Sequence, residues 1–205
     1  MKHTDTDNSD VSNSSANNPD TKNADSYEIT ISAADSIDAE LINTFYAEEK
    51  LYSVLIATLD YIAERMTNGL VLPYFADIDI VLWSEKAQSL DIYLTDTIEG
   101  RELNLAARGK DYATNILSYP SEMPASMIAL MPILPLGELI ICHEVVVHEA
   151  AEQNKTLDQH VSHLLVHGIL HLLGFDHELG QEEQDEMESF EIDILAQLNL
   201  PNPYL

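Results

Sequence analysis

The sequence predicts an α+β fold in which a small mixed sheet packs with several helices. Short apolar runs typical of strands alternate with helical segments along the first two thirds of the chain, and helices gather toward its end. The 205 residues are enough for one domain with a substantial core, and the sequence contains no internal repeat. We therefore expect a single domain over residues 27–205.

The segment before this domain has a different composition. Residues 1–26 are rich in Asn, Asp, Ser and Thr, so we expect a disordered, polar and acidic tail that cannot bury enough surface to offset its ordering entropy. The tail has no apolar stretch of the secretory kind, and no apolar run of the chain approaches the roughly 20 residues that span a bilayer. Cys142 is the single cysteine, which excludes an intrachain disulfide. We expect a cytoplasmic protein with no membrane partner.

The first half of the domain begins with a strand and continues with helix. Residues 27–32 alternate apolar and polar side chains, as a half-buried strand does. Residues 35–67 repeat apolar side chains at helical spacing, which predicts one long helix or two shorter ones, ended by Asn68 and Gly69. Two apolar runs that follow, over 78–83 and 90–95, are predicted as strands.

The second half alternates strands and helices before it ends in helices. Thr156 suits a helix N-cap and Gly174 a helix end, while four prolines mark a loop. The predicted elements are a helix over 97–106, a strand over 115–119, a loop over 120–135, a strand over 138–142 that runs into a helix through 151, and helices over 156–173 and 181–198.

Three histidines near the end of the 156–173 helix have the spacing of metal ligands. His167 and His171 are four residues apart and share one helix face, and Gly174 lets the chain turn back so that His177 supplies a third nitrogen. Three nitrogens with an open fourth position are typical of catalytic zinc. The alternative, three histidines that never meet a metal, is disfavoured by this spacing. The sequence therefore predicts a zinc hydrolase.

The same spacing, His-x3-His-x2-Gly-x2-His, is that of the metzincin proteases. In those enzymes a Glu directly follows the first His and acts as the general base, and here that position is Gly168. A peptidase built on this metzincin-like zinc-binding helix would therefore lack its proton shuttle.

Other polar residues near the three histidines have weaker patterns. Asp176 and His163 are candidates for orienting the ligands, although Asp176 suits a simple turn equally well. His160 shares the helix face of His163 and is expected to pack or to orient. His143 and His148 are expected to be exposed, and Cys142 is expected to be a buried apolar-like residue rather than a ligand.

The chain is strongly acidic, with 36 Asp and Glu against 9 Lys and Arg and a formal net charge of −27. This charge argues against binding bare nucleic acid through the overall field, and no DNA partner is expected. Three of the nine cations lie close together, however, as Arg101, Arg108 and Lys110. The acidic run over 178–193 is read as a solvated helix face in preference to a contact for a basic ribosomal protein.

The segment HGILHLLGFDHE (167–178) resembles the signature of the bacterial YbeY family, the zinc-dependent endoribonucleases of rRNA maturation. Further blocks resemble that family over roughly 90–205: LNLAARGKDYATNILSYP (103–120), LGELIICHEVV (136–146) and the ending NLPNPYL. The sequence departs from the family pattern at three places. It has Glu138 where the family usually has Asp and Tyr119 where Phe is more usual, and residues 67–89 resemble an insertion.

The resemblance implies one Zn²⁺ per chain on His167, His171 and His177, and a functional Arg108. It implies cleavage of single-stranded RNA at the 3′ end of 16S rRNA and a role in quality control of the small ribosomal subunit. Arg108 then binds phosphate, with Lys110 and Arg101 as further substrate-binding candidates. The alternatives are a metzincin-like peptidase and a non-catalytic assembly factor with a structural zinc, and either water or the RNA 2′-OH is the nucleophile.

Overall fold

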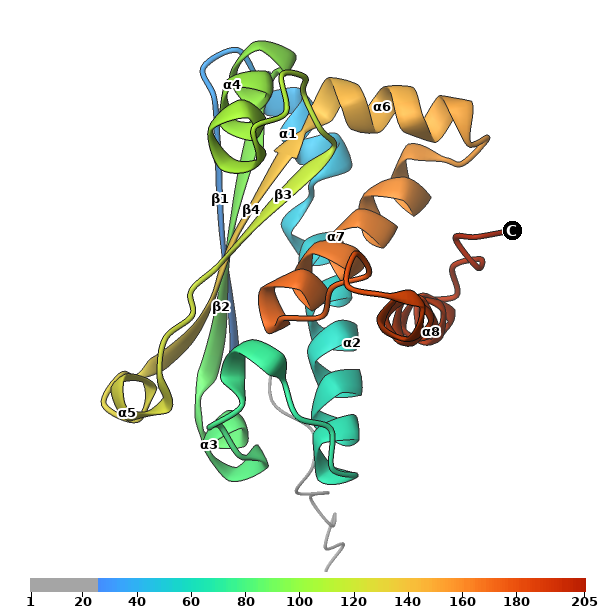
Figure 1. The fold of residues 1–205 in the computed structure, drawn as a ribbon. Helices are drawn as coiled ribbons and strands as arrows, with labels where there is room; N and C mark the ends of the chain where they lie inside the picture. The colour runs from blue at the N-terminus through green and yellow to red at the C-terminus, as the bar shows by residue number, and fades with distance from the viewer. Residues whose placement is uncertain (1–25) are drawn as a thin grey trace, which may run out of the picture.

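The computed structural model describes residues 26–205, which build a four-stranded mixed sheet with helices packed against it (Figure 1). The sheet order is β1-β2-β4-β3, with β3 antiparallel to β4 and the other neighbours parallel. The predicted α+β class is confirmed, whereas the tail expected over 1–26 lies outside the described residues except for Ser26. The strands are β1 (Tyr27–Ala33), β2 (Ala87–Thr95), β3 (Ile116–Pro120) and β4 (Ile133–Cys142).

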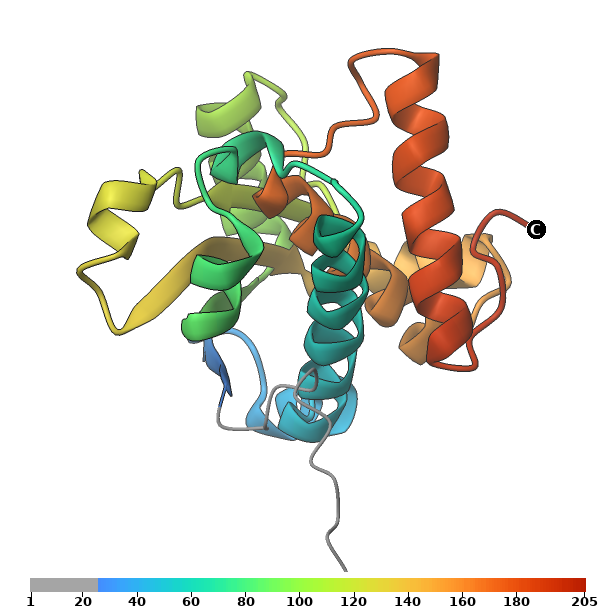
Figure 2. The same ribbon diagram turned by 90° about the horizontal axis from the view of Figure 1, so that it is seen from below.

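Helices α2, α7 and α8 lie on the same side of the sheet, and α8 is on the far side of α7 from the strands (Figures 1 and 2). Helices α4 and α6 follow the ends of β2 and β4 directly. None of the helices within 26–205 combines the length and apolar character that crossing a membrane requires. The helices are α1 (Ala39–Phe45), α2 (Glu48–Thr67), η2 (Pro73–Phe75), α3 (Ile80–Glu85), α4 (Thr97–Arg108), α5 (Ala125–Ile128), α6 (His143–Glu152), α7 (Leu157–Leu173) and α8 (Gln181–Gln197).

The segment predicted as one long helix or two forms two. The chain leaves helical geometry at Tyr46, with φ −121° and ψ 34°, and at Ala47, with ψ 133°. The run over 78–83, predicted as a strand, is instead mostly helix α3, and that prediction is wrong. The carboxylate of Asp79 caps this helix by accepting a hydrogen bond from Leu82 N at 2.9 Å.

The proline-rich segment over 120–135 is predicted as a loop, yet it contains α5 and the first residues of β4. Pro135 belongs to the strand because it lies beside a β-bulge, where a proline is tolerated. At this bulge Ser89 pairs with Pro135 while Leu90 pairs with Gly137, which leaves Leu136 as the extra residue. Gly137 has φ 137°, and a Cβ there would lie 2.2 Å from the backbone oxygen of Tyr119 on β3.

Residues 67–89 complete α2 and then form η2, α3 and the start of β2. Phe75 and Trp83 in this segment are buried and their rings pack edge-to-face, with centroids 6.4 Å apart. This segment therefore contributes to the same core as the sheet. Its status as an insertion stays a prediction.

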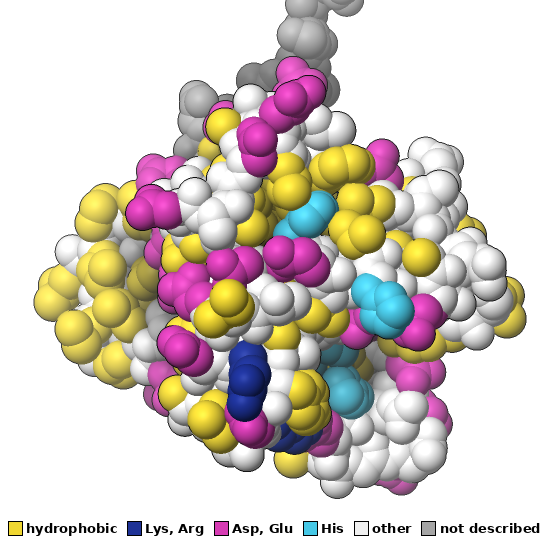
Figure 3. Space-filling view, turned by 90° about the horizontal axis from the view of Figure 1, so that it is seen from above, with side chains coloured by type: hydrophobic (Ala, Val, Ile, Leu, Met, Phe, Trp, Pro, Cys, Tyr) yellow, Lys and Arg dark blue, Asp and Glu magenta, His cyan; other side chains and the backbone are white. Residues whose placement is uncertain are grey.

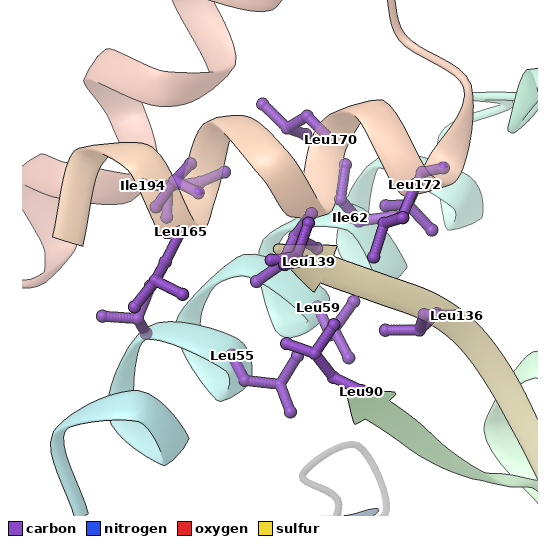
Figure 4. Packing of buried hydrophobic residues seen from close by; sticks show 14 of the residues in the cluster. Leu55, Leu59, Ile62, Leu90, Leu136, Leu139, Leu165, Leu170, Leu172 and Ile194 are labelled. Atoms are coloured by element: carbon purple, nitrogen blue, oxygen red, sulfur yellow. The ribbon is translucent and has the colours of Figure 1, made fainter. Parts of the chain in front are cut away.

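Helix α7 is the centre of the core. Its apolar side chains meet α2 on one side and β4 on another, with α8 behind (Figure 4). Leu165 and Leu170 of α7 and Leu139 of β4 are all at most 1% exposed. Burying each such leucine contributes about 1.5–3 kcal/mol relative to an exposed one. The helix that carries two of the candidate ligands is therefore held from several directions.

Candidate metal centre

Helix α7 starts and stops at residues that fix its length. Thr156 Oγ1 accepts a hydrogen bond from Gln159 N at 3.1 Å, and Gln159 Oε1 accepts one from Thr156 N at 2.9 Å. At the other end Gly174 has φ 99°, a left-handed conformation that suits glycine. A Cβ at Gly174 would also lie 2.8 Å from Pro73 Cβ. The chain therefore turns sharply here, as the sequence predicts, and brings His177 back toward the helix.

Three histidines gather where α7 ends. The Nε2 atoms of His167 and His171 are 3.1 Å apart, one helical turn along the same face. The ring of His177 has its centroid 5.2 Å from each of the other two. One nitrogen of each ring lies within 4.8 Å of the others. The structure thus brings together the three residues that the sequence singles out as ligands.

These imidazoles are suited to bind a cation. Burial, followed by the charges of neighbouring His167 and His177, lowers the pKa of His171 to about 4, so this ring is neutral at pH 7. A neutral imidazole is the form that binds a metal. Within residues 26–205, no further His, Cys, Asp or Glu joins the group. The donor set is therefore three nitrogens with an open position.

A buried carboxylate lies behind His167. Glu191 of α8 is 1% exposed, and its Oε1 accepts a hydrogen bond from His167 Nδ1 at 2.9 Å. His163 Nε2 donates to Glu191 Oε2 at 2.8 Å, and the Tyr204 hydroxyl donates to the same oxygen. Burial raises the pKa of Glu191, but the hydrogen bonds from both histidines outweigh burial and hold the pKa at about 2. The carboxylate is therefore ionised at neutral pH.

Gly168, directly after the first candidate ligand, faces the sheet. A Cβ at this position would lie 2.7 Å from Leu139 Cδ2 and 2.8 Å from Ile116 Cδ1. The absence of a side chain lets α7 approach β3 and β4 closely. This position therefore has no room for the glutamate that metzincin peptidases carry there.

The histidines open onto a cavity of about 500 Å³ that Arg108 also lines. Arg108 is the last residue of α4, and its Nη2 donates to Glu178 Oε1 at 2.7 Å. Glu178 directly follows His177 and lines the same cavity, as do residues 114–120. In Figure 3, dark blue Lys and Arg atoms lie beside cyan His atoms on a face that is otherwise largely acidic, apolar or neutral.

The other two predicted cations differ in their placement. Arg101 forms a two-pronged ion pair with Asp111, at 2.7 and 2.9 Å, and is not among the residues that line the cavity. Lys110 is exposed, and its charge adds to the hydrogen bond from Arg108 in lowering the pKa of Glu178. The structure therefore brings Arg108 to the histidines, with Lys110 near its partner.

Asp176 lines the cavity, and its Oδ1 accepts a hydrogen bond from Glu178 N at 2.9 Å. This is the bond of a turn residue, the simpler of its two predicted roles. No bond from Asp176 to a histidine is present among the described residues. His163, the other candidate for orienting the ligands, contacts Glu191 and reaches His167 through it.

Three further histidines lie outside the group. His160 Nε2 lies 3.0 Å from Glu149 Oε2, and the same oxygen accepts a hydrogen bond from Asn115 Nδ2 at 2.9 Å. His143, expected to be exposed, is buried, because Tyr46 covers it and its hydroxyl lies 3.1 Å from the ring Nδ1. That prediction is wrong. His148 is exposed as expected. Buried Cys142 is likewise as predicted.

Residues 178–193 are predicted to form a solvated helix face, but Glu191 within this run is buried. Its position could have been found, since it lies at helical spacing with Met187, Ile194 and Leu195, which are all apolar and buried. An acidic residue on an apolar helix stripe is uncommon and indicates a buried partner. Tyr204 lies after the last helix, in the ending NLPNPYL that resembles the family, but nothing in that block indicates a contact with Glu191.

Comparisons with known proteins identify a family for this chain. Residues 73–199 match the family model "Endoribonuclease YbeY". A protein of that name from Psychrobacter cryohalolentis is 71% identical over 154 residues, which are 75% of this chain and 99% of the relative. Another, from Acinetobacter baumannii, is 52% identical over 115 residues, 56% of this chain and 73% of the relative.

Among solved structures, a protein from Thermotoga maritima is 22% identical with a TM-score of 0.44, over 83% of this chain and 91% of that one. This likeness is too weak to add to the family match. The match to the family model spans more than half of the chain, and the sequence resemblance to that family is confirmed. The chain belongs to the YbeY endoribonuclease family.

Proposed function

We propose that this chain is a zinc-dependent endoribonuclease that cleaves single-stranded RNA during maturation of the small-subunit rRNA. The observation that carries this proposal is that Arg108 and the three histidines with the geometry of a metal site line one cavity. A cation for phosphate and a metal ligand set are the two components that a phosphodiester hydrolase requires. The name of the curated relatives supports RNA as the substrate.

The three histidines fit zinc by the chemistry of their donors. Imidazole nitrogens suit zinc better than magnesium or calcium, which prefer oxygen ligands. The donor atoms lie within 4.8 Å of one another. The lowered pKa of His171 keeps its ring neutral, so one of its two ring nitrogens carries no proton. Zinc held by these three histidines would supply Lewis-acid chemistry to a phosphate or a water bound in the cavity.

Arg108 provides the second component. Its guanidinium presents parallel N–H donors that match two phosphate oxygens, so it binds and orients the scissile phosphate beside the histidines. Glu178 occupies one of these donors when no RNA is bound. Substrate phosphate therefore competes with the Glu178 carboxylate for this donor. The nucleophile is water or the RNA 2′-OH, and product ends with a 2′,3′-cyclic phosphate would exclude water as the sole attacking group.

The peptidase alternative is disfavoured by Gly168. A peptidase base at this position would need a side chain, and a Cβ would lie 2.7 Å from Leu139 Cδ2. If the 2′-hydroxyl of the RNA is the nucleophile, cleavage does not require a glutamate at this position to activate a water.

The acidity of the chain bears on its partners. With a net charge of −27, we propose that the chain binds RNA weakly alone and acts on the small ribosomal subunit, where proteins of the subunit supply further contacts. DNA is not expected as a substrate. A cytoplasmic location and one domain over 27–205 are part of the same proposal.

The test uses purified full-length protein, its zinc content, and a single-stranded RNA that carries the 3′ end of 16S rRNA. We expect one zinc per chain, loss of cleavage in His167→Ala, and a loss of about 10²–10³-fold in Arg108→Ala, as for other removed groups that stabilise developing charge. Arg101→Ala is the matched control: it removes a cation from the same helix that does not line the cavity, and it should retain activity.

Each alternative has its own outcome. If the protein binds no zinc even after reconstitution, the metal site is refuted. If it binds zinc but His167→Ala and Arg108→Ala leave RNA cleavage unchanged, the enzyme proposal fails and the non-catalytic assembly factor is favoured. Cleavage of a peptide substrate that requires His167 would favour the peptidase.

A further inference from the structure

A group of polar side chains lies behind the histidines, on the side away from Arg108. A second cavity of about 500 Å³ is lined there by His163, His167, Glu191 and Tyr204, among others. Glu191 is 1% exposed, and neither Arg nor Lys lines this cavity. The buried carboxylate is stabilised by hydrogen bonds from two histidines and a tyrosine, without a Lys or Arg partner in this cavity, which is an expensive arrangement for folding.

We propose that Glu191 is a positioning residue for the metal, because it accepts the Nδ1 proton of His167 and so directs the Nε2 lone pair of that ring toward His171 and His177. This inference rests on the proposed metal site. Nothing in the family match assigns a role to Glu191.

The first step concerns the two nitrogens of His167. A neutral imidazole carries its proton on either Nδ1 or Nε2, and only the other nitrogen can bind a metal. Glu191 Oε1 lies 2.9 Å from Nδ1, while Oε2 accepts hydrogen bonds from His163 and Tyr204, so Oε1 faces Nδ1 as an acceptor. The proton is therefore held at Nδ1. The free Nε2 is the atom that lies 3.1 Å from His171 Nε2.

The second step concerns the carboxylate itself. Its Oε1 faces His167, while Oε2 accepts from His163 Nε2 at 2.8 Å and from the Tyr204 hydroxyl. Because each oxygen has a donor, rotation of the carboxylate would break bonds on both sides. The orientation of His167 is thus fixed through Glu191 by residues that do not reach the metal.

The third step concerns where these donors come from. Tyr204 lies beyond α8, in a segment held by a hydrogen bond from Lys155 Nζ to Pro203 O at 2.6 Å. Glu191 lies on α8 between buried Met187 and Ile194. A chain with an apolar residue at that position would have a more favourable free energy of folding, since burying a charge is unfavourable. The carboxylate is therefore better explained by the metal than by the core.

The experiment measures zinc affinity by competition with a coloured chelator, and the Co²⁺ absorption spectrum of the full-length chain. Glu191→Gln keeps the size of the side chain but loses its charge and places an N–H₂ group among donors. We expect zinc affinity to fall about 10–100-fold, the usual effect of losing such a partner, with an altered cobalt spectrum. Tyr204→Phe should shift affinity in the same direction by a smaller factor.

The matched control is Asp193→Asn, which removes an acidic charge from the same helix at an exposed site paired with Arg65. It should bind zinc as the parent protein does. The melting temperature of each metal-free variant shows whether that variant is folded. If Glu191 had only a structural role, a folded variant would keep the zinc affinity of the parent protein.

The outcomes are distinct. If the parent protein binds no zinc, the metal site fails and this inference with it. If the parent binds zinc, His167→Ala does not, and Glu191→Gln binds as tightly as the parent, the inference is overturned while the proposed function stands. Should Glu191→Gln not fold, unchanged zinc affinity in Tyr204→Phe overturns the inference, and a reduced affinity supports it.

Discussion

Replacing Gly168 with Ala tests whether this glycine is required by the packing of α7 on the sheet. The added Cβ would meet Leu139 Cδ2 at 2.7 Å, Ile116 Cδ1 at 2.8 Å and Leu139 Cδ1 at 3.2 Å. All three separations are shorter than an ordinary van der Waals contact. Leu139 is fully buried, so its methyl groups have no free volume into which to move.

Two effects of opposite sign determine the magnitude. Alanine improves helix propensity by about 1 kcal/mol relative to glycine. Overpacking a close-packed core costs about 1–3 kcal/mol. With two separations under 3.0 Å, we place the cost near the upper end, so the free energy of unfolding should fall by about 1–2 kcal/mol.

Gly100→Ala is the matched control, because Gly100 also lies in a helix, α4, and is also buried. Its nearest atoms to an added Cβ are at 3.4 Å, an ordinary contact. We expect this variant to be as stable as the parent or more stable by up to about 1 kcal/mol. The assay is urea unfolding of both variants, with the slope checked for change. If Gly168→Ala were as stable as Gly100→Ala, the steric reason for the absent glutamate would be refuted.

Two further predictions concern charge at the site. Glu178→Gln removes the carboxylate that competes with phosphate for Arg108, so affinity for single-stranded RNA should rise about two- to fivefold, given the small worth of exposed ion pairs; weaker binding in fluorescence anisotropy would contradict this. The second concerns the metal-free protein in acid: because the folded pKa of His171 is about 4, below its ordinary value of 6.5, the unfolded chain takes up the proton first as the pH falls. Stability that is present above pH about 6.5 should decline by up to about 3 kcal/mol by pH about 4. His171→Asn should flatten this decline in chemical denaturation, and equal slopes for the two proteins would show the cause to be wrong.

The histidine cluster is predictable from the sequence because the spacing that brings it together is local. His167, His171 and Gly174 lie within two turns of one helix, where spacing determines which side chains meet. The capping residues of that helix are predictable for the same reason. The partner of His167 is not, because Glu191 reaches it from a different helix and only the packing of α7 against α8 sets their distance. That Arg108 lies near the histidines could be predicted only from the resemblance to the family.

The fold shows the same division between local and long-range information. The run over 78–83 has the apolar content of a strand, and only the cap at Asp79 favours a helix. The start of β4 is hidden by prolines that a sequence alone assigns to a loop. What admits Pro135 to the strand is the bulge beside it, which forms only when β2 pairs with β4.

That bulge also changes the phase of β4. The core residues Leu134, before the bulge, and Leu136, in the bulge, are at even positions, and after the bulge the core residues are Leu139 and Ile141, at odd positions. The extra residue switches the parity of the strand once, so that both halves present their apolar side chains to the same core. Deleting a single residue at the bulge would turn one half of β4 over and take Leu139 away from α7. The position of the helix that carries two candidate ligands thus depends on a one-residue count in the strand against which it packs.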